Sequence, residues 1–189
     1  MIKSELRKKY NELRNGLSPN KLAVYSQNIT ELLLKNVQFE AKTVSLFLPI
    51  EKKGEINTYG LMEKILSIGG KVALPVSDFD NNEINHYLYQ EGITQLVTNK
   101  YGIPEPVEGT FLAPVNFDVV IVPLLAVDIK GNRVGYGKGF YDRFLSMCRE
   151  DCLFIGLHLF EPEKKTITDT DGFDIPLHAV VTPQTFIRF

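Results

Sequence analysis

Segment 133–143 carries the densest set of residues that could do chemistry. It reads Arg-Val-Gly-Tyr-Gly-Lys-Gly-Phe-Tyr-Asp-Arg, so three glycines alternate with a tyrosine and a lysine. Glycine lets backbone N–H groups approach a ligand and tolerates positive φ angles. A helix is predicted from Phe140, because Phe144 and Met147 follow it at helical spacing. Since the N-terminus of a helix attracts anions, the segment predicts a site for phosphate groups.

Four charged side chains of this segment suit a nucleoside triphosphate. Lys138 adds a flexible full charge, and Arg133 is a second candidate phosphate ligand. Asp142, one turn into the predicted helix, offers the hard oxygen ligands that Mg²⁺ prefers. Arg143 either contacts a phosphate or pairs with a carboxylate. The spacing is neither a Walker A loop nor the Gly-x-Gly-x-x-Gly dinucleotide fingerprint. The same residues could also form only a tight loop with a surface ion pair.

Two helices are predicted at the start of the chain. The first ends near Gly16, and its apolar stripe consists of Leu6, Tyr10, Leu13 and Leu17. Ser18 then predicts an N-cap and Pro19 the first position of a second helix, which extends to about Asn36. Lys3 and Arg7 are four residues apart, so they share one face of the first helix. They could reach phosphates or form a solvated basic face.

Strands and helices alternate along the rest of the chain. A helix capped by Asn57 or Thr58 extends to Ile68, and a second occupies 140–149. The predicted strands are 43–48, 71–76, 118–127, 153–159 and 178–182. This alternation implies parallel strands with helices on both faces. We predict a single three-layer α/β/α domain over 1–189 with a mostly parallel, Rossmann-like sheet.

Three segments that follow predicted strands are expected to line one cleft, because ligands of such sheets bind at the carboxyl ends of the strands. They are 49–58, 101–106 and 132–142. The region 78–109 is rich in Asn, Gly, Pro and Glu, so we expect a hairpin and an active-site loop there.

Composition excludes several classes of function. The 21 basic and 23 acidic residues give a net charge of −2, which lacks the basic field that nucleic-acid binding requires. No run approaches the about 20 apolar residues of a membrane span, and no signal region is evident. Cys148 and Cys152 fit neither a disulfide framework nor a zinc site, and the three histidines show no ligand spacing. We expect a cytoplasmic protein, monomeric or homodimeric.

The whole of segment 133–143 resembles the signature Arg-x-Gly-Tyr-Gly-Gly-Gly-Tyr-Tyr-Asp-Arg of the 5-formyltetrahydrofolate cyclo-ligase family. Lys138 and Phe140 stand at the two differing positions, and some members also carry lysine at the first. The resemblance continues through 3–7, 48–58, 101–106, 118–123, 154–157 and 174–182. Two departures occur near the C-terminus. Phe173 replaces a common histidine and Pro183 a common glutamate, so no role can be transferred to either position.

The resemblance implies a reaction driven by ATP and Mg²⁺. The formyl oxygen of 5-formyltetrahydrofolate is phosphorylated, N10 attacks the activated carbon, and phosphate departs. The products are 5,10-methenyltetrahydrofolate, ADP and phosphate. Such an enzyme supplies mainly positioning and neutralisation of charge.

The expected roles follow from this reaction. Glu55 would accept hydrogen bonds from the 2-amino and N3–H groups of the pterin, unless it only stabilises a helix N-terminus. The catalytic candidates are Lys138, Asp142 and Arg143, and the metal ligands Asp142 and Asp174. The expected ATP-binding residues are Lys3, Ser4, Glu5, Leu6, Arg7, Arg133, Val134, Gly135, Tyr136, Gly137, Lys138, Gly139, Phe140 and Tyr141. The expected folate-binding residues are Ile50, Glu55, Tyr136, Gly137, Lys138, Gly139 and Phe140, where the aromatic rings, Tyr141 included, could stack on the pterin.

Another class of function also fits a glycine-rich loop with basic residues. A phosphosugar isomerase or a regulatory phosphosugar-binding module would use both, without ATP or Mg²⁺. Asp142, together with Lys3 and Arg7, favours ATP. A dehydrogenase is disfavoured because the dinucleotide fingerprint and its ribose-binding acid are missing.

Overall fold

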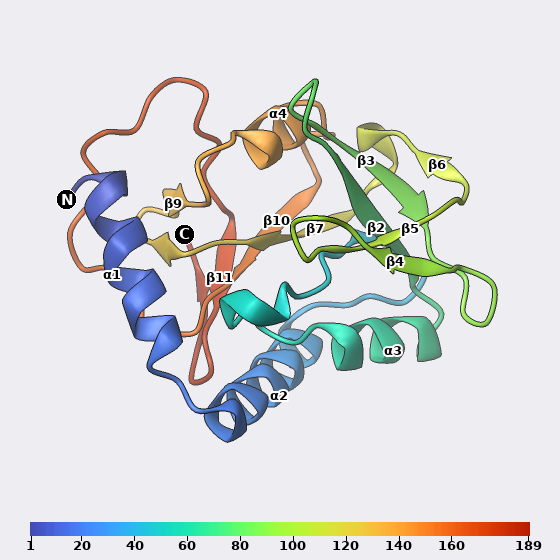
Figure 1. Cartoon of the computed structure of the whole chain (residues 1–189), viewed down its shortest axis with the longest axis horizontal. Coiled ribbons are helices and arrows are strands. Elements are labelled where there is room, and N and C mark those ends of the chain that lie inside the picture. Colours follow the sequence, from blue (N-terminus) through green and yellow to red (C-terminus); the bar gives the residue numbers. More distant parts are fainter.

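An eight-stranded sheet crosses the computed structural model, which describes residues 1–189 (Figure 1). The strand order is β12-β11-β10-β7-β1-β2-β3-β6. The five strands from β11 to β2 are parallel, whereas β12, β3 and β6 pair antiparallel at the two edges. The strands are β1 (Thr43–Ser45), β2 (Lys71–Asp78), β3 (Glu83–Leu88), β6 (Phe111–Leu112), β7 (Val119–Pro123), β10 (Leu153–Leu157), β11 (Ala179–Val181) and β12 (Phe186–Arg188). The prediction of a mostly parallel α/β sheet is confirmed.

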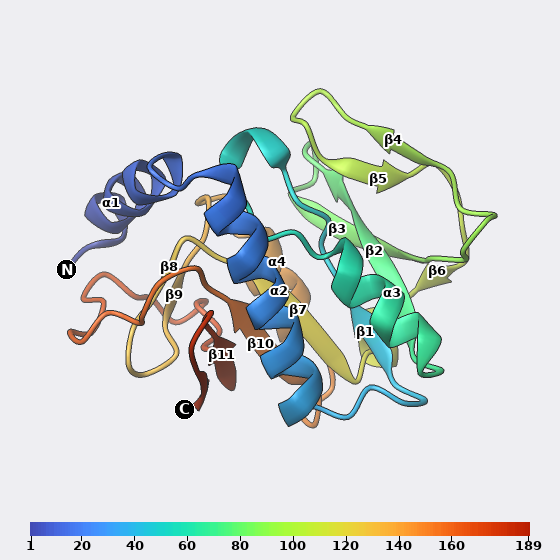
Figure 2. The ribbon, with the colours of Figure 1, turned by 90° about the horizontal axis from the view of Figure 1, so that it is seen from below.

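Helices cover both faces of this sheet (Figures 1 and 2). The helices are α1 (Lys3–Asn15), α2 (Pro19–Asn36), α3 (Tyr59–Ser67) and α4 (Phe140–Ser146). Leu33 of α2 and Ile65 of α3 belong to the core on one face, while Phe144 of α4 belongs to the core on the other. Burying a side chain such as Phe144 stabilises the fold by about 1.5–3 kcal/mol. The predicted three layers are therefore present. None of the helices is long and apolar enough to cross a bilayer.

The central strands lie where they were predicted, although β1 ends at Ser45 rather than Leu48 and the predicted strand 118–127 divides in two. The side chains of Val120, Ile121 and Val122 are fully buried, as expected for a strand covered on both faces. The predicted strand 118–127 is wrong beyond Pro123. There β7 ends, and β8 (Ala126–Val127) pairs instead with β9 (Arg133–Val134) as a separate hairpin. Pro123 has no N–H to continue a ladder, which favours this break.

Two short 3₁₀ helices connect elements of the sheet. The 3₁₀ helix η1 (Glu51–Lys53) follows β1, and a second 3₁₀ helix, η2 (Pro114–Asn116), precedes β7. Strands β4 (Leu96–Thr98) and β5 (Pro104–Pro106) form the hairpin expected within 78–109.

Helix α1 departs from its predicted stripe. Leu6 and Tyr10 of the predicted stripe are buried, here against β8 and β9, but Leu13 is 42% exposed and its neighbour Arg14 is buried. The stripe is therefore wrong at this position. By contrast, α2 begins as predicted, because the Ser18 hydroxyl caps it and Pro19 occupies its first position.

Candidate active site

A cleft of about 450 Å³ opens at the carboxyl ends of β1, β2 and β7. Phe47 follows β1, Ser77 lies near the end of β2, and Pro123 ends β7, and all three line the cleft. The volume suits a small-molecule ligand. The three segments that were expected to meet here, 49–58, 101–106 and 132–142, all contribute to the wall.

The loop between β9 and α4 forms one wall. Gly137 and Gly139 have φ angles of 91° and 71°, a left-handed conformation that favours glycine. A Cβ on Gly137 would lie 3.3 Å from the guanidinium carbon of Arg7, so the missing side chain also makes room for that cation. Arg7 Nε donates a 3.0 Å hydrogen bond to the Gly135 carbonyl, which ties α1 to the loop.

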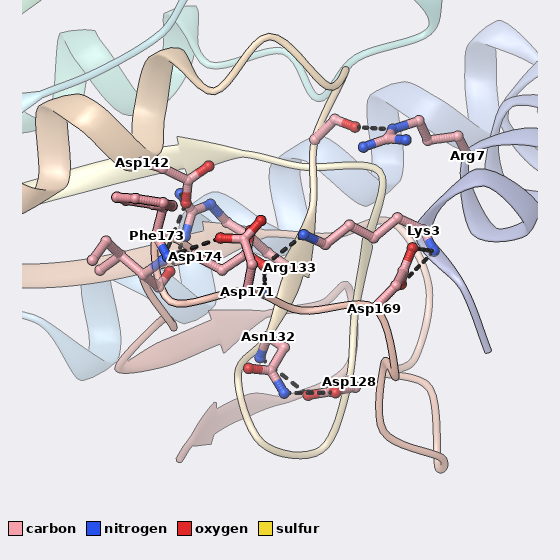
Figure 3. A network of polar contacts seen from close by, with 12 residues as sticks. Lys3, Arg7, Asp128, Asn132, Arg133, Asp142, Asp169, Asp171, Phe173 and Asp174 are labelled. Atoms are coloured by element: carbon pink, nitrogen blue, oxygen red, sulfur yellow. Dashed lines mark hydrogen bonds and ion pairs between the residues drawn. The ribbon is translucent and has the colours of Figure 1, made fainter.

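Charged residues from both ends of the chain meet beside this loop (Figure 3). Lys3 Nζ lies 2.5 Å from Asp174 Oδ2, and Arg133 donates a 2.6 Å hydrogen bond to Asp142 Oδ1. Burial lowers the pKa of Arg133 and the neighbouring Asp142 raises it, but an arginine stays charged in any case. Two cations and two carboxylates are thus held on the glycine-loop side of the cleft.

The two carboxylates fit a magnesium ion held jointly with a phosphate. Asp142 Oδ2 and Asp174 Oδ1 make no hydrogen bond within the chain, and both residues line the cleft. No cluster of three or more His, Cys, Asp or Glu side chains could hold a metal by itself. Mg²⁺ commonly binds one or two carboxylates and completes its shell with water and substrate phosphates. The donor set agrees with that mode.

Glu55 lies buried on the wall formed by the segment after β1. Its side chain is enclosed, with the residue only 6% exposed, yet it lines the cleft. Oε2 accepts the N–H of Ile50 at 2.7 Å, and Oε1 accepts the hydroxyl of Tyr136 at 2.5 Å. Helix α3 begins only at Tyr59, after its N-cap Thr58. Glu55 is therefore not the first-turn residue of that helix.

Aromatic side chains form the apolar part of the cleft. Tyr136, Phe140 and Tyr141 line it, as predicted, together with Ile50. Phe79 and Tyr101 also line it, with their ring centroids 4.0 Å apart, and Phe79 meets Phe140 edge-on at 5.3 Å. Burial raises the pKa of Tyr136 and of Tyr141, so both hydroxyls keep their protons.

Most of the predicted site residues come together, but five side chains do not line the cleft. Leu6 and Val134 are buried in the apolar cluster under α1, while Ser4 and Glu5 are exposed. Arg143 donates to the backbone carbonyls of Asn82 and Lys138, so its guanidinium pairs with no carboxylate and does not line the cleft.

Sequence reasoning missed several residues of the site. Phe79 lines the cleft from outside the expected segments, and Lys53, Tyr101 and Ile103 lie within those segments but were not named as site residues. Arg14 contacts the wall by donating to the Tyr136 hydroxyl at 3.3 Å. Arg14 had a signal, because Lys3, Arg7, Tyr10 and Arg14 are spaced by four, three and four residues and so share one helix face. None of the three histidines lines the cleft, as expected, and both cysteines are free.

Comparisons with known proteins identify the relatives of this chain. A model described as the 5-formyltetrahydrofolate cyclo-ligase family matches residues 1–183. The 5-formyltetrahydrofolate cyclo-ligase of Escherichia coli K12 is 32% identical and the match covers 90% of this chain and 94% of that protein. The NMR structure of 5,10-methenyltetrahydrofolate synthetase from Aquifex aeolicus is 32% identical, with a TM-score of 0.77, covering 100% of this chain and 93% of that one. A synthetase structure from Mycoplasma pneumoniae, 24% identical, shares the fold with a TM-score of 0.76, over 96% and 98% of the two chains. With the glycine loop, the cations and the buried glutamate in one cleft, and with a match over nearly its whole length, the chain belongs to the 5-formyltetrahydrofolate cyclo-ligase family.

Proposed function

We propose that this protein converts 5-formyltetrahydrofolate and ATP to 5,10-methenyltetrahydrofolate, ADP and phosphate, with Mg²⁺ as the metal. One observation carries the proposal. A single cleft has cations and a glycine loop on one wall and a buried carboxylate on the other, and aromatic rings from both walls line it. A phosphate donor and a pterin can therefore bind side by side. The E. coli and Aquifex relatives are named for the cyclo-ligase and synthetase activities.

The phosphate wall would bind and orient ATP. Lys3, Arg7 and Lys138 offer positive charge to the phosphates, and the loop offers backbone N–H groups. Charge that develops during phosphoryl transfer is stabilised by groups fixed in advance. Mg²⁺, when bound, would neutralise phosphate charge, with Asp142 and Asp174 as its protein ligands.

The opposite wall would orient the folate. Glu55 would accept the two N–H donors on the edge of the pterin, while the rings of Phe140 and Tyr136, from the glycine-loop wall, would cover its faces. The formyl oxygen would then attack the γ-phosphorus, and ADP would leave with the electrons of the broken P–O bond. N10 attacks the activated carbon and loses its proton, and the C–O bond breaks to release phosphate. Holding N10 and the formyl carbon together contributes through proximity.

The direct test is to mix the protein with Mg-ATP and 5-formyltetrahydrofolate and follow the absorbance of the methenyl product. We expect product only when all three are present, with loss of turnover after removal of Mg²⁺ by a chelator. ADP should appear in a one-to-one ratio with the product. Thermal-shift measurements with sugar phosphates would accompany the assay. Stabilisation by a sugar phosphate, without methenyl formation, would overturn the proposal.

A further inference from the structure

Arg14 is a buried arginine that contacts a residue of the cleft wall without lining the cleft itself. The residue is 5% exposed, and its guanidinium lies within salt-bridge distance of no carboxylate. One terminal nitrogen donates to the carbonyl of Leu124, just after β7, and the other donates to the hydroxyl of Tyr136 at 3.3 Å. A buried charge is costly unless it is compensated. Its hydrogen bond to Tyr136 continues to the carboxylate of Glu55 through the Tyr136 hydroxyl.

The chemistry of the three groups fixes the direction of this connection. A guanidinium can only donate, and a tyrosine hydroxyl has one proton to give. Because Arg14 occupies an acceptor site on the Tyr136 oxygen, the hydroxyl proton points to Glu55 Oε1 at 2.5 Å. Burial and the charge of Glu55 raise the pKa of Tyr136, so this proton remains on the phenol. A donor that receives a hydrogen bond itself becomes a stronger donor.

The connection leaves a defined number of acceptor sites on Glu55. A carboxylate has about four lone-pair sites. The Tyr136 hydroxyl occupies one on Oε1, and the Ile50 N–H occupies one on Oε2. One site remains on each oxygen, which equals the two adjacent N–H donors of a pterin edge. The carboxylate is thus held on both sides in one orientation.

We propose that Arg14 is a positioning residue for substrate recognition, which orients Glu55 through the Tyr136 hydroxyl. Tyr136 comes from the glycine loop and Glu55 from the opposite wall, 81 residues apart, so the same contact joins the two halves of the cleft. The inference rests on the proposed function, since it takes Glu55 as the group that binds the pterin. The proposed role belongs to a residue that does not line the cleft, and it explains why this arginine is buried.

The test is a double-mutant cycle on Arg14 and Glu55, read by steady-state kinetics with each substrate varied in turn. Arg14→Gln should lower kcat/KM for 5-formyltetrahydrofolate by roughly 10-fold or more, the loss of one charge-assisted hydrogen bond. The KM for ATP of the same variant should differ from that of wild type by less than about 2-fold. In a Glu55→Gln background, Arg14→Gln should cause little further loss for the folate, because the group that it orients has already been changed. Arg14→Lys, which keeps the charge, should restore part of the activity.

Two further variants keep the inference testable if changes at a buried arginine prevent folding. Tyr136→Phe removes only the connecting hydroxyl and should reproduce the selective loss for the folate. Tyr10→Phe is the matched control. Tyr10 lies in α1 and donates its hydroxyl to Glu163, so this variant also removes a tyrosine–glutamate hydrogen bond, but one outside the cleft. It should leave the folate KM unchanged.

The outcomes separate the two proposals. A wild-type protein that makes no methenyl product would overturn the proposed function. A wild-type protein that turns over, together with a Tyr136→Phe variant of unchanged folate KM, would overturn the positioning role alone. Additive losses for Arg14→Gln and Glu55→Gln would also overturn it.

Discussion

Arg133 donates a 2.6 Å hydrogen bond to Oδ1 of Asp142, and the same oxygen accepts the N–H of Ile175. Asp142 therefore joins β9, α4 and the segment before β11, while its other oxygen makes no hydrogen bond. One carboxylate oxygen is structural, and the second is available to a ligand. Substitutions of Asp142 must therefore distinguish its structural role from its role towards a ligand.

Asp142→Asn and Asp142→Ala make that separation. Alanine leaves the buried Arg133 without its partner and should cost about 1–3 kcal/mol in the free energy of unfolding. Asparagine keeps one acceptor oxygen and should cost less. Both variants should lower turnover by roughly 10²-fold or more, the scale of a lost electrostatic stabiliser. Denaturant unfolding and methenyl formation measure the two effects. Wild-type turnover of either variant at saturating Mg-ATP would remove Asp142 from the site.

Lys138→Ala should weaken the use of ATP much more than the binding of folate. The side chain is exposed on the glycine loop, and it forms no ion pair in the chain. Its charge is therefore free for phosphates. We expect the KM for ATP to rise on the order of 10- to 100-fold, while Lys138→Arg retains most activity. If only the folate KM rose, Lys138 would have to be assigned to the folate.

Glu55→Gln should weaken folate binding by about 2–4 kcal/mol, or roughly 30- to 10³-fold. The amide replaces one acceptor oxygen by a donor, so an N–H of the pterin would face an NH₂ group. ATP affinity should hardly change. Calorimetric titration of both ligands measures this, with Glu51→Gln in the exposed 3₁₀ helix as the matched control. Equal folate affinity in wild type and Glu55→Gln would show that Glu55 does not bind the pterin.

Two buried histidines should make stability depend on pH. Burial lowers the pKa of His86 to about 3, and burial with the charges of Arg14 and Lys9 lowers that of His158 to about 3. The folded state thus keeps both rings neutral, whereas the unfolded chain binds protons below its ordinary pKa of about 6.5. The contribution of the two neutral rings to the free energy of unfolding is therefore fully present above about pH 6.5, and it is lost as the pH falls towards 3. At pH 5 each histidine should lower the free energy of unfolding by about 2 kcal/mol relative to neutral pH.

The comparison of two pH values checks this expectation. Denaturant unfolding at pH 7 and pH 5 should show a smaller difference for His86→Gln than for wild type, by about 2 kcal/mol. Glutamine can still bond to the Ser45 hydroxyl, which contacts His86 Nε2 at 2.8 Å. An identical pH dependence in both proteins would refute the assignment.

The local signals in the sequence predicted most of the fold. Ser18 and Pro19 mark the start of α2, and the fully apolar run of β7 marks a central strand, because caps and periodicity are properties of neighbouring residues. The glycine loop and its cleft were predicted for the same reason. Family membership also sets aside the phosphosugar alternative.

The positions that could not be predicted depend on distant partners. The spacing of α1 allows either Leu13 or Arg14 to face inwards. Arg14 does so because its partners are the Leu124 carbonyl and Tyr136, more than 100 residues away in sequence. The end of β7 at Pro123 likewise depends on pairing between β8 and β9. Phe173, where the family pattern has histidine, is 84% exposed, and nothing in the structure explains the substitution.

The attachment of α1 to the far end of the chain determines when the glycine-loop wall of the cleft can be completed during synthesis. Lys3 meets Asp174 across 171 residues, and Arg7 meets Gly135 across 128. The ribosome releases α1 long before either partner has been made. In that interval α1 has only its own hydrogen bonds, and an isolated helix of its length is marginal in water. The wall is completed only after residue 174 has left the ribosome, so a nascent chain that stops earlier lacks the contact between Lys3 and Asp174.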